Sequence, residues 1–280
     1  MSPPFLRLIR KMAVENHALV AVGLEDEPIL EKILQTLYEA QEKNYARLVL
    51  VAGKRVHLKV SRGIRTVNSD NPASLLVEML SRGEVDAVVR GSISAAKFLA
   101  ELQRVFGVRK GLRVALLRSA FDIEFFLTPV GIDEGETLAE KLELLRAGVR
   151  LHKFFKVEPK VAVLSGGRKE DLGRSEAVDR SLAEAEFLAA RAQELGITMN
   201  IKHYGILLED ALKDGCTLLL APNGMVGNMI FRTLVFLGGG GAVGAPYMGL
   251  SRVAVDVSRA MESYSDAVAL ASALAGTKNL

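Results

Sequence analysis

Short apolar runs alternate with longer segments of helical periodicity along most of the chain, and this alternation constrains the fold most. The runs end at small or turn-forming residues, which is typical of buried strands. They occupy residues 17–22, 48–51, 85–89, 114–117, 161–164 and 217–221, and the helical segments include residues 28–44, 98–106, 137–155 and 182–195. Strands that alternate with helices indicate βαβ units, so the sequence predicts an α/β fold built on parallel sheets.

The stretch from Thr217 to Arg259 has the order of features expected of an anion site. An apolar strand at 217–221 is stopped by Pro222-Asn223-Gly224, and Gly227-Asn228 then precedes a helical segment at 229–237. A strand, a small-residue loop and a helix start leave backbone N–H groups free to face an anion. Ordinary turns explain the same glycines equally well, because a single glycine-rich loop is a weak signal.

Other loops fall at the same kind of position, just after a predicted strand. Gly53 and Gly91-Ser92 follow two of the early strands, and Ser165-Gly166-Gly167-Arg168-Lys169 follows the strand at 161–164. In parallel sheets, ligands bind beyond the carboxyl ends of strands. The loop at 165–169 is therefore read either as an anion loop or as a solvated turn.

Composition excludes several classes of function. The 280 residues carry a net charge of +3, no tryptophan and one cysteine, so neither nucleic-acid stacking nor a disulfide framework is favoured. The four histidines lack metal-ligand spacing, and the chain has no P-loop or Gly-x-Ser-x-Gly motif. Residues 233–251 are uncharged, but their glycines and Pro246 disfavour a spanning helix. We therefore expect a soluble, cytoplasmic protein without a metal site, a nucleic-acid partner or a membrane partner.

Three motifs, in order, resemble those of the phosphate acetyl/butyryl transferase family. They are Val161-Ala162-Val163-Leu164-Ser165, then Leu220-Ala221-Pro222-Asn223 with Gly227-Asn228, then Gly249-Leu250 with Asp256-Val257-Ser258-Arg259. The resemblance extends from about residue 85 to the end of the chain. In shortness and overall shape the sequence is most similar to the methanogenesis marker protein 4 group, whose members are labelled MtxX, a methyltransferase-associated subunit.

This resemblance implies two α/β subdomains like those of isopropylmalate dehydrogenase, with a cleft between them, and a homodimer in a methanogenic archaeon. We place residues 1–147 and 248–280 in the first subdomain and residues 148–247 in the second, inserted one. The helix at 137–155 would link the two subdomains, and the chain would return to the first from residue 248.

The resemblance also implies roles for particular residues around an acyl phosphate in the cleft. Ser258 and Arg259 would hold its phosphoryl and carbonyl oxygens, and Asp266 would accept the proton of a thiol, coenzyme A or a related compound. Ser165 and Asn228 would contact phosphate, and the remaining candidates for the substrate-binding loops are Gly91, Ser92, Asn223 and Gly227. No cofactor and no metal are implied.

Departures from the family pattern leave two functions open. The glycine expected after Ser-Arg is Ala260, and a His-Thr-Thr segment is replaced by Ser94-Ala95-Ala96. One hypothesis is a transferase acting on a phosphorylated or acyl-phosphate substrate. The other is a non-catalytic anion-binding or assembly subunit associated with methanogenic methyltransferase or other methanogenesis enzymes. No motif requires a methyl donor.

Overall fold

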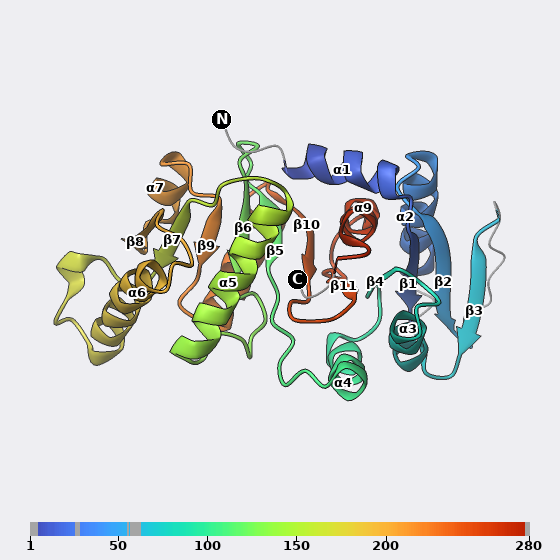
Figure 1. The fold of residues 1–280 in the computed structure, drawn as a ribbon, viewed down its shortest axis with the longest axis horizontal. Coiled ribbons are helices and arrows are strands. Elements are labelled where there is room, and N and C mark those ends of the chain that lie inside the picture. The colour runs from blue at the N-terminus through green and yellow to red at the C-terminus, as the bar shows by residue number, and fades with distance from the viewer. Residues whose placement is uncertain (1–4, 26–28, 55, 57–62, 278–280) are drawn as a thin grey trace. The chain divides into compact units, whose positions relative to one another are not determined.

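The computed structural model describes residues 5–25, 29–54, 56 and 63–277, and their contacts divide the chain into two units (Figure 1). The terminal unit comprises Leu6–Gly111 and Val243–Leu280, and the inserted unit comprises Met1–Phe5 and Leu112–Ala242. The chain thus leaves the terminal unit after Gly111, whereas the sequence analysis placed this boundary after residue 147. The return at Val243 lies close to the predicted return at residue 248.

The terminal unit is built on a largely parallel sheet in the order β3-β2-β1-β4-β11-β10. Strand β1 pairs in parallel with β2 on one side and with β4 on the other, and β11 extends the sheet in parallel beside β4. Strand β10 runs antiparallel to β11. The strands are β1 (Leu19–Leu24), β2 (Arg47–Gly53), β3 (Arg65–Ser69), β4 (Ala87–Val89), β10 (Gly241–Pro246) and β11 (Val253–Asp256).

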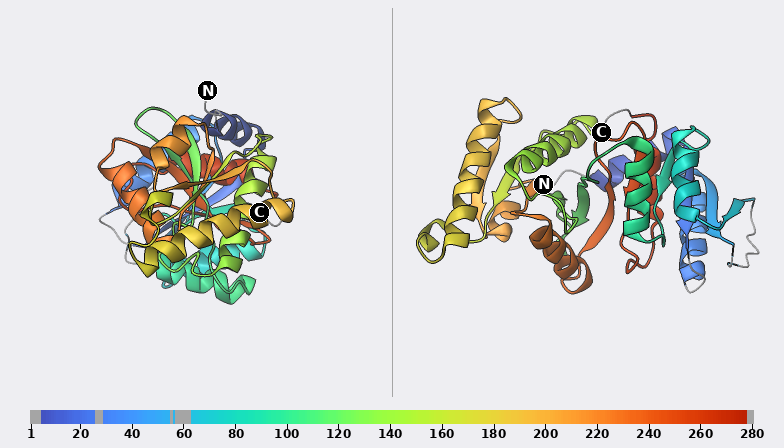
Figure 2. Two further views of the ribbon diagram at one scale, coloured as in Figure 1. Left: turned by 90° about the vertical axis from the view of Figure 1, so that its left-hand side faces the viewer. Right: turned by 90° about the horizontal axis from the view of Figure 1, so that it is seen from below.

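Helices cover both faces of this sheet, as expected for a doubly wound arrangement. Helices α3 and α4 lie side by side against one face, and α9 packs on β1, β4 and β11 beside α2 (Figures 1 and 2). Asn71 begins α3 by accepting a hydrogen bond from the Ser74 amide at 3.1 Å, with Pro72 in the first turn. The helices are α1 (Phe5–Asn16), α2 (Leu30–Glu42), α3 (Pro72–Ser81), α4 (Ala95–Phe106) and α9 (Ser265–Leu274).

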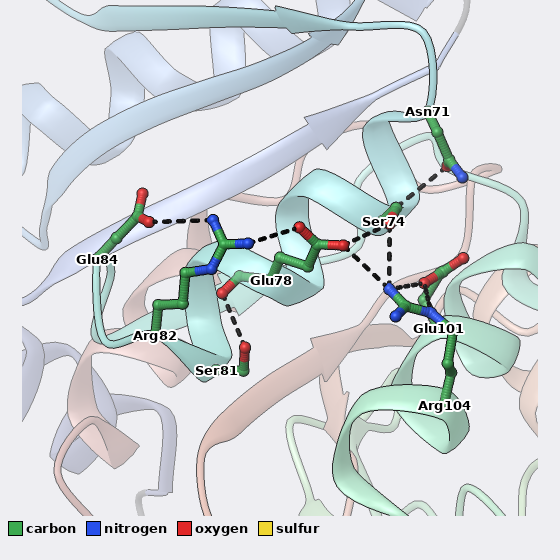
Figure 3. A network of polar contacts seen from close by, with 8 residues as sticks. All are labelled: Asn71, Ser74, Glu78, Ser81, Arg82, Glu84, Glu101 and Arg104. Carbon is green, nitrogen blue, oxygen red and sulfur yellow. Dashed lines mark hydrogen bonds and ion pairs between the residues drawn. The ribbon is translucent and has the colours of Figure 1, made fainter.

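An exposed polar network joins α3 to α4 (Figure 3). Arg104 contacts Glu78 at 3.1 Å and Glu101 at 2.7 Å, and Arg82 reaches Glu78 from the end of α3. Ion pairs this exposed contribute at most about 1 kcal/mol each. The apolar core that contains Phe98 and Tyr247 therefore holds the two helices in place.

In the inserted unit, the sheet strands lie in the order β5-β6-β9-β7-β8. Strands β6, β9, β7 and β8 are parallel, but β5 forms an antiparallel hairpin with β6. The sequence analysis placed residues 114–117 in a parallel sheet of the first subdomain, which was wrong because β6 was not recognised as their antiparallel partner. The strands are β5 (Ala115–Arg118), β6 (Glu124–Thr128), β7 (Val161–Leu164), β8 (Ile201–Gly205) and β9 (Leu218–Leu220).

Helices α5 and α6 cover one face of this sheet, and α8 packs on the other (Figure 2). Helix α5, predicted as a link between subdomains, lies within the inserted unit, where Gly148 packs directly against Leu218. Ser175 caps α6 through the Val178 amide, so this helix begins at Glu176, before the predicted helical segment at 182–195. The helices are α5 (Leu138–Phe154), the 3-10 turn η2 (Lys169–Asp171), α6 (Glu176–Glu194), α7 (Leu208–Lys213) and α8 (Gly224–Phe236).

The predicted α/β fold with two parallel-sheet units is confirmed. Within the described part of the chain, no helix is both long enough and apolar enough to cross a membrane.

Candidate functional site

The order of strands in the terminal unit reverses direction between β1 and β4. Such a switch point leaves a crevice at the carboxyl ends of the strands, where α/β proteins bind ligands. Here the two strand ends approach very closely, because a Cβ on Gly91 would lie 2.0 Å from the Gly23 carbonyl oxygen. Gly91 also has a φ of 61°, a left-handed conformation that favours glycine. We call the loops after β1, β4 and β11 the terminal-unit edge.

Arg90 holds together two of the strand ends at the terminal-unit edge. Its side chain is 5% exposed, pairs with Asp256 through Nε, and donates to the carbonyl oxygens of Ile93 and Val257. The guanidinium therefore joins the end of β4 to the end of β11. Sequence analysis identified the Gly91-Ser92 loop but not the role of Arg90, because its partners Asp256 and Val257 lie 166 and 167 residues away in the sequence.

Ser258 and Arg259 form the turn that follows β11. The turn is closed by the Met261 amide, which donates to the Ser258 carbonyl at 3.0 Å, and Lys32 Nζ donates to the Arg259 carbonyl at 2.7 Å. Ser258 is half-buried and Arg259 is exposed. Among the residues that the structure describes, none accepts a hydrogen bond from the Arg259 guanidinium, so this cation is available to an anionic ligand.

A carboxylate already lies at the start of α4. Glu25 accepts a hydrogen bond from the Ser94 amide at 2.7 Å and pairs with Lys97, while the Ser94 side chain makes no capping bond. Partial burial opposes the ionisation of Glu25, but these hydrogen bonds and the charges of Lys97 and Arg259 hold its pKa below the usual value. Ser92, buried beside it, accepts from the Glu25 amide at 2.9 Å. The replaced Ser94-Ala95-Ala96 segment thus begins a helix whose N-terminus is occupied by the chain's own carboxylate.

Asp266, the predicted base, lies in the first turn of α9. Both of its carboxylate oxygens receive hydrogen bonds from Arg10, at 2.9 and 3.0 Å. The pair is partly exposed, with side-chain exposures of 43% for Arg10 and 29% for Asp266. Asp266 would have to leave Arg10, or share it, to accept a proton from a substrate.

In the inserted unit, the carboxyl ends of β6, β9, β7 and β8 form a second edge, which we call the inserted-unit edge. Asn223 caps α8 by accepting from the Val226 amide at 2.9 Å, and Asn228 donates to the Val130 carbonyl at the same distance. Gly227 packs so tightly that a Cβ there would lie 1.8 Å from the Pro129 carbonyl oxygen. Gly227 and Asn228, expected to precede a helix at 229–237, therefore lie inside α8 and hold the 129–131 loop against it.

A buried ion pair that sequence analysis missed supports the same loop. Arg113 Nε lies 2.6 Å from Glu134 Oε1, with side-chain exposures of 13% and 1%. Burial raises the pKa of Glu134 even with Arg113 beside it. The sequence carries no signal for this pair, because neither residue lies in a motif that indicates a site.

Ser165 lies at the end of β7, beneath the exposed Gly166. Its hydroxyl donates to the Gly167 carbonyl at 2.9 Å and contacts His203 Nε2 at 2.8 Å. The structure thus places four candidates on the inserted-unit edge, namely Ser165, Asn223, Gly227 and Asn228, and four on the terminal-unit edge, namely Gly91, Ser92, Ser258 and Arg259. In the described ranges, no group of three His, Cys, Asp or Glu side chains could hold a metal ion.

Comparison with solved structures defines the class of fold. A branched-chain phosphotransacylase from Enterococcus faecalis superimposes with a TM-score of 0.68 at 18% identity, covering 90% of this chain and 99% of that one. The chain therefore has the phosphotransacylase fold. No protein-family model matches it.

Sequence relatives identify the family to which the chain belongs. A phosphate butyryltransferase from Clostridium acetobutylicum is 27% identical over 99% of this chain and 100% of its own length. A Methanosarcina mazei protein named "Putative methyltransferase mtx subunit X" is 44% identical over 96% of this chain and 94% of its own length. The chain belongs to the mtx subunit X family.

Proposed function

We propose that the protein is a transferase of methanogenic archaea that binds a phosphorylated or acyl-phosphate substrate. In this proposal Ser258 and Arg259 hold phosphoryl or carbonyl oxygens, and the loop that begins at Ser165, together with Asn228, contacts phosphate. Coenzyme A or a related thiol attacks the acyl carbon, the acyl–phosphate bond breaks, and inorganic phosphate leaves. Asp266 accepts the thiol proton.

One observation carries the proposal: an exposed guanidinium beside a hydroxyl at the carboxyl end of β11. A guanidinium presents paired donors that match the oxygens of a phosphoryl group. Arg259 follows Ser258 in the turn after β11, at the carboxyl edge of the strands, which is where α/β sheets bind ligands. The phosphotransacylase fold and the phosphate butyryltransferase relative support the same substrate class.

The test is turnover of acetyl or butyryl phosphate with coenzyme A by purified protein. Consumption of the thiol can be followed directly, because the chain's one cysteine, Cys216, is buried and adds little background. Thiol consumption with stoichiometric release of phosphate supports the transferase. A protein that binds acetyl phosphate but yields no thioester contradicts it.

A second candidate function is a non-catalytic, anion-binding subunit that assembles with methyltransferase or other methanogenesis enzymes. The Arg10–Asp266 pair favours it, because the predicted base is already neutralised by a cation. The Glu25 carboxylate at the start of α4 favours it as well. Co-purification of a methyltransferase with the native protein, together with absent turnover, would support this function.

The proposal includes a homodimer formed through the inserted unit. Phe121, Met225 and Met229 are 85%, 62% and 65% exposed around an apolar groove of about 760 Å³ beside α8. Apolar surface gathered in this way is typical of a protein interface. Sedimentation should give a dimer that Met229→Lys dissociates, whereas Met199→Lys, at a methionine 73% exposed outside this groove, should leave it intact.

A further inference from the structure

Three side chains in the inserted unit form a continuous chain of hydrogen bonds. Ser165 Oγ lies 2.8 Å from His203 Nε2, and His203 Nδ1 lies 3.0 Å from Glu186 Oε1. Ser165 follows β7 directly, His203 belongs to β8, and Glu186 lies on α6. Ser165 and His203 are 3% and 8% exposed, so water has little access to either side chain.

Counting protons shows that this chain has two states. An ionised Glu186 only accepts, so His203 Nδ1 must carry a hydrogen. The Ser165 hydroxyl donates to the Gly167 carbonyl at 2.9 Å, so Nε2 must also carry a hydrogen to donate to Ser165. The observed set of contacts is therefore complete only with a protonated His203. With a neutral His203, the Ser165 hydroxyl would donate its hydrogen bond to Nε2 instead, and the Gly167 carbonyl would lose that hydrogen bond.

The Gly167 carbonyl matters because it belongs to the predicted anion loop. The Gly167 carbonyl oxygen accepts the hydrogen bond of the buried Ser165 hydroxyl and faces Gly205, where an added Cβ would lie 2.9 Å from it. A released carbonyl is free to turn outward, where its negative end repels an anion. Deprotonation of His203 also removes one positive charge from the neighbourhood of Arg168 and Lys169.

We propose that His203 positions the 165–169 loop when it carries a proton. Binding of an oxyanion to this loop is therefore accompanied by uptake of a proton on His203. This inference rests on the proposed function in one respect, namely that the loop contacts phosphate. The ligand class is a phosphoryl or sulfuryl group.

Charged groups from several elements surround His203. Glu186 faces it from α6, and Lys169 of η2 shares the same Oε1 atom at 2.8 Å. Hydrogen bonds from Lys169 and His203 hold the pKa of Glu186 below its usual value, so its carboxylate stays an acceptor at neutral pH. His203 also borders a recess of about 380 Å³ whose charged lining includes Arg168, Lys169, Lys202, Lys213, Asp210 and Asp214.

The same three residues also have the spacing of a nucleophilic serine with its base. Burial argues against that role here. Ser165 is 3% exposed and its hydroxyl is committed to Gly167, so an acyl carbon has no approach to it.

The test follows the His203 ring signal by NMR across pH 5 to 9, with and without saturating sulfate. Sulfate keeps its charge over this range, whereas phosphate itself titrates. Sulfate should raise the pH midpoint of His203 and leave that of His17, in the terminal unit, unchanged. Arg168→Ala should abolish the shift.

Calorimetry with sulfate supplies the second measurement. Affinity should fall about tenfold or more as pH rises, the range for a hydrogen bond to a charged group. In His203→Gln, whose amide donates at every pH, the affinity should become independent of pH, whereas His17→Gln should behave as the native chain.

Two outcomes overturn the inference differently. Sulfate binding that depends on Arg168 but leaves the His203 midpoint unmoved refutes the proton linkage alone, and the proposed function stands. Absence of both sulfate and acetyl phosphate binding at every pH removes the proposed function and the linkage together.

Discussion

Arg90 and Asp256 form a buried ion pair directly beneath the turn that carries Ser258 and Arg259. Their side chains are 5% and 11% exposed, and Arg90 donates further to two backbone carbonyl groups. Two strand ends that are distant in sequence are thereby held together by one guanidinium. The conformation of the proposed oxygen-binding turn depends on a residue that does not itself belong to the turn.

Replacing Arg90 should destabilise the protein strongly. Arg90→Met leaves Asp256 buried without its cation, which costs about 3–5 kcal/mol of unfolding free energy. The matched control is Arg82→Met in the exposed α3–α4 network (Figure 3), where Arg82 is 62% exposed and the loss should stay below about 1 kcal/mol. Urea unfolding measures both. Equal losses in the two variants would refute a special role for the buried pair.

Arg259→Ala should weaken anion binding without affecting the fold. A charged hydrogen bond of about 1.5–3 kcal/mol corresponds to a loss of about 10- to 100-fold in affinity for phosphate or sulfate. Arg252→Ala, at an exposed arginine before β11, should leave the affinity unchanged. Calorimetry measures both affinities, and a native affinity in Arg259→Ala would refute the proposed oxygen-binding role.

Asp266→Asn and Arg10→Gln separate a catalytic from a structural role for their pair. If Asp266 is the general base, Asp266→Asn should lower turnover about 100-fold or more. Arg10→Gln leaves the carboxylate and should spare turnover, with a stability cost of about 1 kcal/mol or less for this partly exposed pair. Steady-state kinetics and thermal unfolding give the comparison. Equal losses of turnover and stability in both variants would mean that the pair acts only structurally.

Gly227→Ala should be destabilising although alanine is the better helix former. Its Cβ would lie 1.8 Å from the Pro129 carbonyl oxygen, so backbone must shift at a cost of about 1–3 kcal/mol. At Gly166 the nearest atoms to a Cβ lie 3.5 Å away, on Ser181, so Gly166→Ala should change stability by less than about 0.5 kcal/mol. Thermal unfolding that ranks the two variants in the opposite order would contradict this packing.

His152 should make the inserted unit sensitive to acid. Burial lowers its pKa from an ordinary 6.5 to about 4, although it contacts the Gly148 carbonyl and the Thr217 hydroxyl. Because the folded pKa is depressed, the stabilisation is present above about pH 6.5 and is lost as the pH falls towards 4. The difference amounts to about 3 kcal/mol.

Urea unfolding across this range, compared between the native chain and His152→Gln, checks the prediction. The variant lacks the titrating ring, so its stability should change less between pH 6.5 and 4. His17→Gln serves as the control and should keep the native slope. A native slope in His152→Gln would show that other groups carry the acid sensitivity.

Local patterns in the sequence determined the fold class and the positions of the main loops. Apolar runs such as 161–164 and 217–221 indicate buried strands, and residues such as Asn71 and Asn223 cap the helices that follow. These signals act over a few residues, so the sequence alone carries them. They placed Ser165 and Gly91 after strands, which is where the structure has them, whereas Asn228, expected before a helix at 229–237, lies inside α8.

Tertiary structure alone decided which of these loops have which partners. The β5–β6 hairpin moves residues 114–117 into the inserted unit, and Arg10 meets Asp266 across 256 residues of sequence. Arg90 with Asp256 and Ser165 with His203 are likewise pairs between distant segments. Each pairing depends on strand order and on burial, which local periodicity does not encode. A charged residue has the same sequence pattern whether its side chain is solvated or paired with a buried partner.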